Sequence, residues 1–118
     1  MKKYLIPAFE RKAKSITAID VKQLTSYTDT LIIIEAGSQR QVTSIAQHLI
    51  KSLKGQGKKA IGAEGVKEGQ WALLDYGEVI IHIFESEARS FYDIEGLWAD
   101  APRLDLSEFE AAYQSRGE

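Results

Sequence analysis

A glycine and a serine stand where the most apolar segment of the chain gives way to a helical pattern. Gly37 and Ser38 follow the segment 31–36, and Ser38 with Gln41 fits the capping-box pattern that opens a helix. Backbone N–H groups and the helix dipole favour an anion at such a turn, so a phosphate site is one interpretation. An ordinary helix cap is the other, and it is favoured because neither G-x-x-x-x-G-K-[ST] nor G-x-G-x-x-G accompanies the turn.

The same glycine–serine turn opens the active site of nucleotidyltransferases, and this allows a second test. The two divalent cations of that site need two carboxylates one residue apart on the next strand. No Asp-x-Asp or Asp-x-Glu pattern falls on any expected strand of this chain. We therefore expect no metal, no cofactor and no catalytic residues, and we keep a nucleotidyl or phosphoryl transferase as the enzyme alternative.

Two histidines are the remaining candidates for acid–base or metal chemistry. His82 alternates with isoleucines in an expected strand, and His48 lies in the helix that Ser38 opens. We interpret His82 as a structural residue, with a base paired to Asp75 as the alternative. The chain has no cysteine, which excludes disulfides, thiolate metal sites and cysteine nucleophiles.

Aromatic and charged residues between positions 71 and 98 have the composition of a protein-binding surface. Aromatic and arginine side chains dominate binding hot spots, because they give large contact areas for few immobilised torsions. The alternative is that both tryptophans fill the core. Because alternate residues of strand 71–75 face opposite sides, we expect the partner to bind at the hairpin after it. The candidate partner-binding residues are Trp71, Asp75, Tyr76, Glu78, Arg89 and Glu95.

Composition predicts one globular domain over residues 1–118. Of these residues, 44% are hydrophobic, and the longest apolar runs of four residues are far below the roughly 20 of a membrane span. The N-terminus lacks a signal-peptide cleavage site, so we expect a cytoplasmic protein with no membrane partner. The net charge of −2 and the pI of 5.7 argue against a protein that coats nucleic acid, and we expect no DNA partner.

Charge is nevertheless distributed unevenly along the chain. Residues 1–22 carry six Lys/Arg and two acids, whereas residues 99–118 carry two Arg and five acids. Two solvated ends are one interpretation. Electrostatic steering toward a polyanionic assembly is the other.

The elements that would position these residues follow from periodicity. We expect a helix at 2–14, with Pro7 in its first turn, and a second helix that begins at Ser38 and ends at Gly55 and Gly57. A third helix is expected at 86–98. A short fourth helix is expected in the C-terminal tail, 103–118, where Ser107 and Glu110 form a second capping box. Strands are expected at 16–21, 31–36, 60–64, 71–75 and 79–84, with a hairpin at 76–78. This order predicts an α/β fold: a mixed five-stranded sheet flanked by helices.

Residues 5 to 102 resemble the ribosomal silencing factor family, also called Iojap-like. The matching stretches occur in the family's order, and they are 18–21, 37–46, 64–65, 69–84 and 89–98. Within and between them the chain departs from the family pattern at Thr30, Ile94 and Gly96.

The resemblance implies a nucleotidyltransferase-like fold without catalytic residues. It also implies a partner, the large ribosomal subunit, bound through ribosomal protein L-fourteen where the small subunit docks. Binding there would block subunit joining and lower translation when nutrients are short, and a role in large-subunit maturation is also implied. An RNA-binding assembly factor that uses the basic N-terminus is the third hypothesis, and a homodimer of the free protein stays open.

Overall fold

The computed structural model of the protein describes residues 1–86 and 99–116. Along the chain its elements are α1 (Lys2–Glu10), β1 (Ser15–Asp20), β2 (Thr30–Ala36), α2 (Gln39–Gly55), β3 (Gly62–Glu64), β4 (Trp71–Asp75), β5 (Val79–Glu85) and α5 (Ser107–Arg116). The predicted helix 86–98, with Arg89 and Glu95, lies outside the described residues apart from Ser86.

The five strands form one sheet in the order β1-β2-β5-β4-β3. Strands β2 and β5 run parallel, and every other neighbouring pair is antiparallel. The mixed five-stranded sheet predicted from the sequence is thereby confirmed. Strand β2 is apolar along almost its whole length because it lies between β1 and β5, and Glu35 is its only residue that is not buried.

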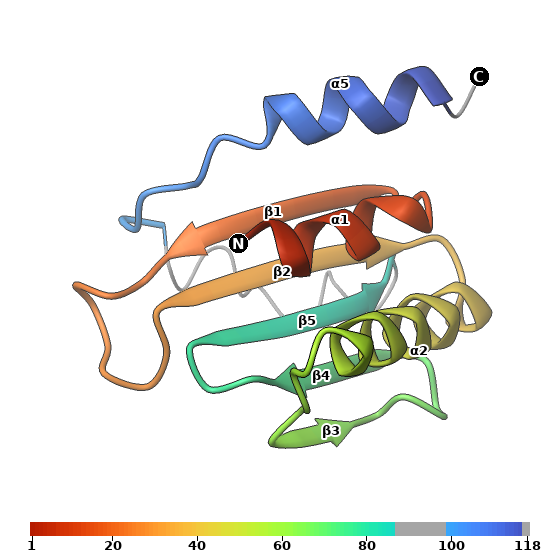
Figure 1. The fold of residues 1–118 in the computed structure, drawn as a ribbon, viewed down its shortest axis with the longest axis horizontal. Coiled ribbons are helices and arrows are strands. Elements are labelled where there is room, and N and C mark those ends of the chain that lie inside the picture. The colour runs from red at the N-terminus through yellow and green to blue at the C-terminus, as the bar shows by residue number, and fades with distance from the viewer. Residues whose placement is uncertain (87–98, 117–118) are drawn as a thin grey trace.

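Helices α1 and α2 cover one face of this sheet, and α5 lies beside α1 near the β1 edge (Figure 1). The larger core cluster fills the space between helices and sheet, and it includes Leu5, Ile34, Leu49 and Leu74. A smaller cluster lies on the opposite face and consists of Ile19, Val21, Leu31, Ile33, Ile80, Phe84 and Ala101. Within the described ranges, no helix has the length and apolarity to cross a bilayer.

Helix α2 begins and ends at the residues that its sequence predicts. The Ser38 hydroxyl accepts a hydrogen bond from the Gln41 backbone N–H at 3.1 Å. At the other end Gly57 has φ +83° and donates to Lys54 O, while the next N–H donates to Leu53 O. This pair of bonds is a Schellman motif, and it needs the left-handed backbone that glycine adopts without strain. Gly55 is still helical, so Gly57 alone ends the helix.

Several predicted boundaries are wrong, each for a local reason. Helix α1 ends at Glu10 rather than at residue 14, because Lys12 takes a positive φ of 55° and turns the chain into β1. Pro7 lies in the middle of α1, where burial of Tyr4, Leu5 and Ala8 holds the short helix in place. The second capping box is also wrong, because Asp105 accepts the Ser107 backbone N–H and the helix begins at Ser107 itself.

Candidate functional site

The turn between β2 and α2 uses its own side chains to satisfy two of its backbone donors. The Gln41 side-chain oxygen accepts from the Gly37 N–H at 2.6 Å, and Ser38 Oγ accepts from the Gln41 N–H. The Gln41 amide nitrogen then donates to the backbone oxygens of Arg11 and Lys12. An anion would have to displace these bonds, so the geometry favours the cap interpretation of this turn.

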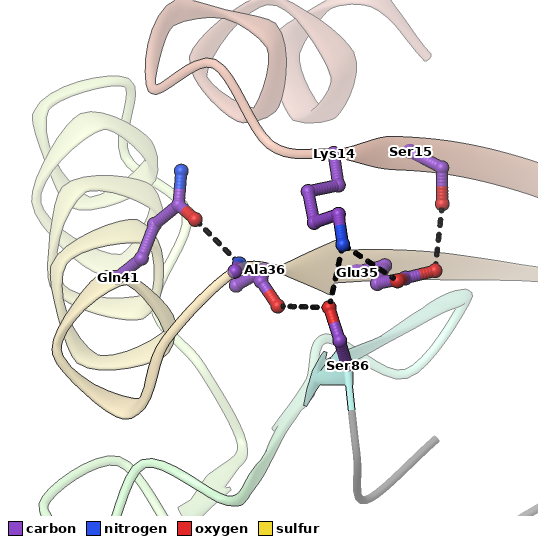
Figure 2. Close-up of polar contacts among 7 residues, drawn as sticks. Lys14, Ser15, Glu35, Ala36, Gln41 and Ser86 are labelled. Carbon is purple, nitrogen blue, oxygen red and sulfur yellow. Dashed lines mark hydrogen bonds and ion pairs between the residues drawn. The ribbon is translucent and has the colours of Figure 1, made fainter. Parts of the chain in front are cut away.

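Beside this turn, Lys14, Glu35 and Ser86 form a polar network (Figure 2). The Lys14 amino group lies 3.2 Å from Ser86 Oγ and 3.8 Å from the Glu35 carboxylate, and Ser15 Oγ donates to the other Glu35 oxygen. Ser86 in turn donates to the backbone oxygen of Ala36 at 3.0 Å. The Ser86 proton is therefore directed at a carbonyl rather than at a base. The network ties β1, β2 and the end of β5 together.

His82 is a structural residue, as predicted. It is 8% exposed, and its Nδ1 accepts the indole N–H of Trp71 at 3.1 Å. Burial lowers the pKa of His82 to about 4, so the ring is neutral at pH 7. The alternative pairing with Asp75 is wrong, because His82 lies opposite Leu73 and the Asp75 carboxylate accepts the Gly77 N–H instead.

Strand β4 divides its residues between two faces, as the alternation predicted. Trp71, Leu73 and Asp75 are half-buried, and the first two pack against the smaller core cluster. The Trp71 ring stacks on Phe84 with centroids 5.2 Å apart. Trp71 therefore combines a core contact with a partly exposed surface, so neither interpretation of this tryptophan is wholly right.

The expectation that Tyr76 offers its ring to a partner is wrong for this structure. Tyr76 is 4% exposed and packs edge-on against Tyr4, at 5.7 Å between ring centroids, in the core beneath the helices. Its hydroxyl has no hydrogen-bond partner among the described residues. Burial raises its pKa. Trp71 and Tyr76 lie on opposite faces of the sheet, so they do not form one surface.

Glu78 lies at the tip of the β4–β5 hairpin and links three parts of the chain. Its carboxylate accepts from the Lys58 amino group at 3.2 Å and from the Tyr4 hydroxyl at 3.2 Å. The hydrogen bond and charge of Lys58 lower the pKa of Glu78, while burial and Glu78 raise the pKa of Tyr4 to about 12. Half of the Glu78 side chain remains exposed, so it can also face a partner.

Sequence reasoning missed a group of exposed apolar residues around this hairpin. The loops 21–29, 56–61 and 76–78 meet at one end of the sheet (Figure 1). Backbone bonds join Asp29 to Glu78, and Ile61 lies against Gly77. The most exposed large apolar side chains of the described residues are in these loops, except Met1, which lines a hollow together with Asp29 and Glu78. We call them the hairpin-end surface: Met1 (43% exposed), Leu24 (52%), Tyr27 (72%) and Ile61 (74%). Their scattered sequence positions gave no common signal.

Comparison with known proteins places this geometry in a family. The family model described as "Ribosomal silencing factor during starvation" matches residues 2–118. The chain belongs to the ribosomal silencing factor family. A protein of Halalkalibacterium halodurans named as ribosomal silencing factor RsfS is 34% identical over 97 residues, which are 82% of this chain and 83% of that protein.

A solved structure and a more distant sequence relative are also similar to this chain. A crystal structure of a protein from Chromobacterium violaceum has a TM-score of 0.78 at 37% identity, and the match covers 83% of this chain and 82% of that one. A mouse protein named for mitochondrial assembly of the large ribosomal subunit is 29% identical over 75% of this chain and 40% of its own length. The bacterial family members are named as silencing factors, which are regulators rather than enzymes.

Within residues 1–86 and 99–116, no three His, Asp or Glu side chains gather as ligands for a metal ion. The turn at Gly37 is closed by Gln41. The hairpin-end surface is a second candidate site, distinguished by the exposure of its large apolar side chains.

Proposed function

We propose that this protein binds the large ribosomal subunit in the cytoplasm through ribosomal protein L-fourteen. Bound there, it blocks docking of the small subunit and so represses translation when nutrients are scarce. Family membership over residues 2–118 is the observation that carries this proposal. The name of the mouse relative supports the choice of the large subunit.

The hairpin-end surface suits a protein partner because its exposed side chains are large and apolar. Tyr27 is the natural anchor, since a tyrosine gives a wide contact area at little entropic cost. Asp75 and Glu78 border this surface and offer carboxylates to a basic partner. Electrostatic complementarity of this kind raises the association rate more than it raises affinity.

Trp71 extends the proposed contact along β4, because it shares a half-buried face with Leu73 and Asp75. Arg89 and Glu95 remain predicted contacts outside the described residues. In the free protein the apolar hairpin-end surface could instead pair with a second copy, and a homodimer is the form we would expect from that pairing.

Steric blocking predicts stoichiometric action. One bound copy disables one subunit, so inhibition of subunit joining should saturate near one protein per large subunit. Titration into purified subunits, followed by sedimentation of joined ribosomes, measures this ratio. Complete inhibition at a small fraction of the subunit concentration would instead indicate a catalyst.

Two substitutions on the hairpin-end surface locate the contact in the same assay. Replacing Tyr27 or Leu24 by Ser should weaken binding to L-fourteen by about 2 kcal/mol, or roughly 30-fold, as loss of an anchor does. Tyr76→Phe is the control, since it removes only a buried hydroxyl. Equal pull-down of all three variants would move the contact elsewhere.

A further inference from the structure

The outward face of α2 carries a stripe of polar residues that the proposed function does not use. Arg40, Ser44, Gln47, Lys51 and Lys54 recur at intervals of four and three, so they lie on one side of the helix. The apolar residues Val42, Ile45, Ala46, Leu49 and Leu53 occupy the opposite side and are fully buried. We call the five polar residues the α2 stripe.

No negative charge lies within α2 itself. Its 17 residues include no Asp or Glu. The neighbouring α1 and the loops that follow both helices add Lys2, Lys3, Arg11, Lys12, Lys14, Lys58 and Lys59. The one acid within α1 is Glu10, which lies 2.9 Å from His48 Nε2. Lys14 and Lys58 are paired with Glu35 and Glu78, and the remaining cations still outnumber Glu10 on the outer surface of α1 and α2, although the whole chain has a net charge of −2.

A groove connects the stripe with the end of α1. It encloses about 530 Å³ and is lined by Arg11, Ser44, Gln47, His48, Lys51, Ser52 and Gly55. The Arg11 guanidinium lies 3.3 Å from His48 Nδ1, which holds this cation over the groove. Cations, hydroxyls and an amide together form the donor set that phosphate oxygens prefer.

We propose that the α2 stripe binds the phosphate backbone of ribosomal RNA on the large subunit. The inference rests on the proposed function for its location on the ribosome, and it adds a second contact on another face of the molecule. From Arg40 to Lys54 the stripe spans about 21 Å of helix. That length can face several successive phosphates of one strand.

Other polyanions fit this surface less well. An amphipathic helix binds a membrane by inserting its apolar face, but the apolar face of α2 is occupied by the sheet. An acidic protein would be expected to meet aromatic anchors, and the stripe has none. A phosphate backbone needs only spaced donors, which the stripe supplies.

Salt dependence of binding tests this contact directly. The stripe variant carries Lys51→Gln and Lys54→Gln, and the control Lys67→Glu changes the net charge equally on a loop between β3 and β4. Binding to purified large subunits is measured from 50 to 300 mM salt. Each lost phosphate contact should flatten the slope of log affinity against log salt by about 0.7–0.9, so we expect a change near 1.5 and roughly tenfold weaker binding at low salt.

Two companion measurements separate this inference from the proposed function. Pull-down with isolated L-fourteen should be equal for wild type, stripe variant and control, because that protein does not meet the stripe. If wild type fails this pull-down but the stripe variant still flattens the salt slope, the partner is wrong and the RNA contact stands. If stripe variant and wild type have the same slope, the RNA contact is overturned. Stripe-dependent binding to vesicles of anionic lipid, without a change of slope on subunits, overturns it as well.

Discussion

At the scale of single residues, the burial of His82 and its contact with Trp71 set the protonation state of its ring. The indole N–H of Trp71 can only donate, so the Nδ1 that it contacts at 3.1 Å must be unprotonated. Protonation of His82 would place two donors against each other and bury a charge. The ring is therefore a neutral acceptor that orients Trp71 on the half-buried face of β4.

This burial predicts a loss of stability in mild acid. The pKa of His82 is about 4 in the folded protein and about 6.5 when unfolded, so between these values only the unfolded chain binds the proton. The free energy of unfolding should fall as pH drops from 7 to 4.5, by about 2–3 kcal/mol from this residue. Urea denaturation of wild type and His82→Gln at both pH values measures the difference.

The control for this experiment is the other histidine. His48 lies between Glu10 and Arg11 on the helix surface, and His48→Gln leaves His82 in place, so this variant should keep the pH dependence that His82 contributes. A His82→Gln variant that loses as much stability in acid as wild type would show that His82 does not contribute.

At the scale of elements, α2 depends on the residue that ends it. Gly57 has φ +83° with no atom within 4 Å of an added Cβ, so only backbone strain opposes a side chain there. Gly55 has the same empty surroundings but a helical backbone. The two glycines thus separate the effect of conformation from the effect of space.

Their alanine variants should change stability in opposite directions. Gly57→Ala should lower the free energy of unfolding by about 1 kcal/mol, because alanine resists the left-handed conformation. Gly55→Ala should raise it by up to about 1 kcal/mol, because alanine favours the helix. Chemical denaturation at pH 7 measures both, and a cost of similar size for Gly55→Ala would contradict this account of the helix end.

At the scale of the whole molecule, the C-terminal segment makes two separate contacts with the rest of the protein. Residues 102–104 pair with the outer edge of β1, through Asp20 N–H to Pro102 O and Leu104 N–H to Ala18 O. Helix α5 then packs on α1, where Phe9 stacks on Phe109 at 5.7 Å and on Tyr113 at 6.0 Å. The first contact covers the outer edge of β1, and the second covers part of α1.

Truncation should distinguish the contributions of these two contacts to stability. Removing residues 107–118 takes away the half-buried Phe109 and Tyr113, so we expect a loss of about 2 kcal/mol with the sheet retained. Removing residues 101–118 also takes away the pairing with β1 and the buried Ala101 and Leu106, and it should cost clearly more. Thermal melts with circular dichroism report both, and equal melting temperatures would refute the separation.

The uneven distribution of charge along the chain becomes a charged surface only in the folded molecule. Residues 1–60 hold eleven Lys/Arg and four acids, whereas residues 61–118 hold four Lys/Arg and thirteen acids. Because both α1 and α2 belong to the first half and cover the same face, the imbalance becomes a positive helix layer. The net charge, which argued against phosphate binding, is the sum of the basic first half and the acidic second half, so it does not reveal the positive helix layer.

Elements with strong local signals could be predicted from the order of residues alone. The apolar runs of β2 and β5, the Ser38 cap, the turn at Gly77 and the alternation along β4 were all predictable, because each depends on residues close together in the chain. The order of elements predicted the mixed sheet, and the quoted stretches predicted the family.

Which face of each element is buried became clear only from the packing of helices against the sheet. Alternation put Trp71 and Tyr76 on opposite faces, but it could not say that the helices cover the Tyr76 side. The contacts of Glu78 with Lys58 and Tyr4, and the backbone bonds that join Asp29 and Ile61 to the hairpin, link residues far apart in sequence. Such contacts depend on how whole layers pack, and no local pattern of residue types specifies that packing.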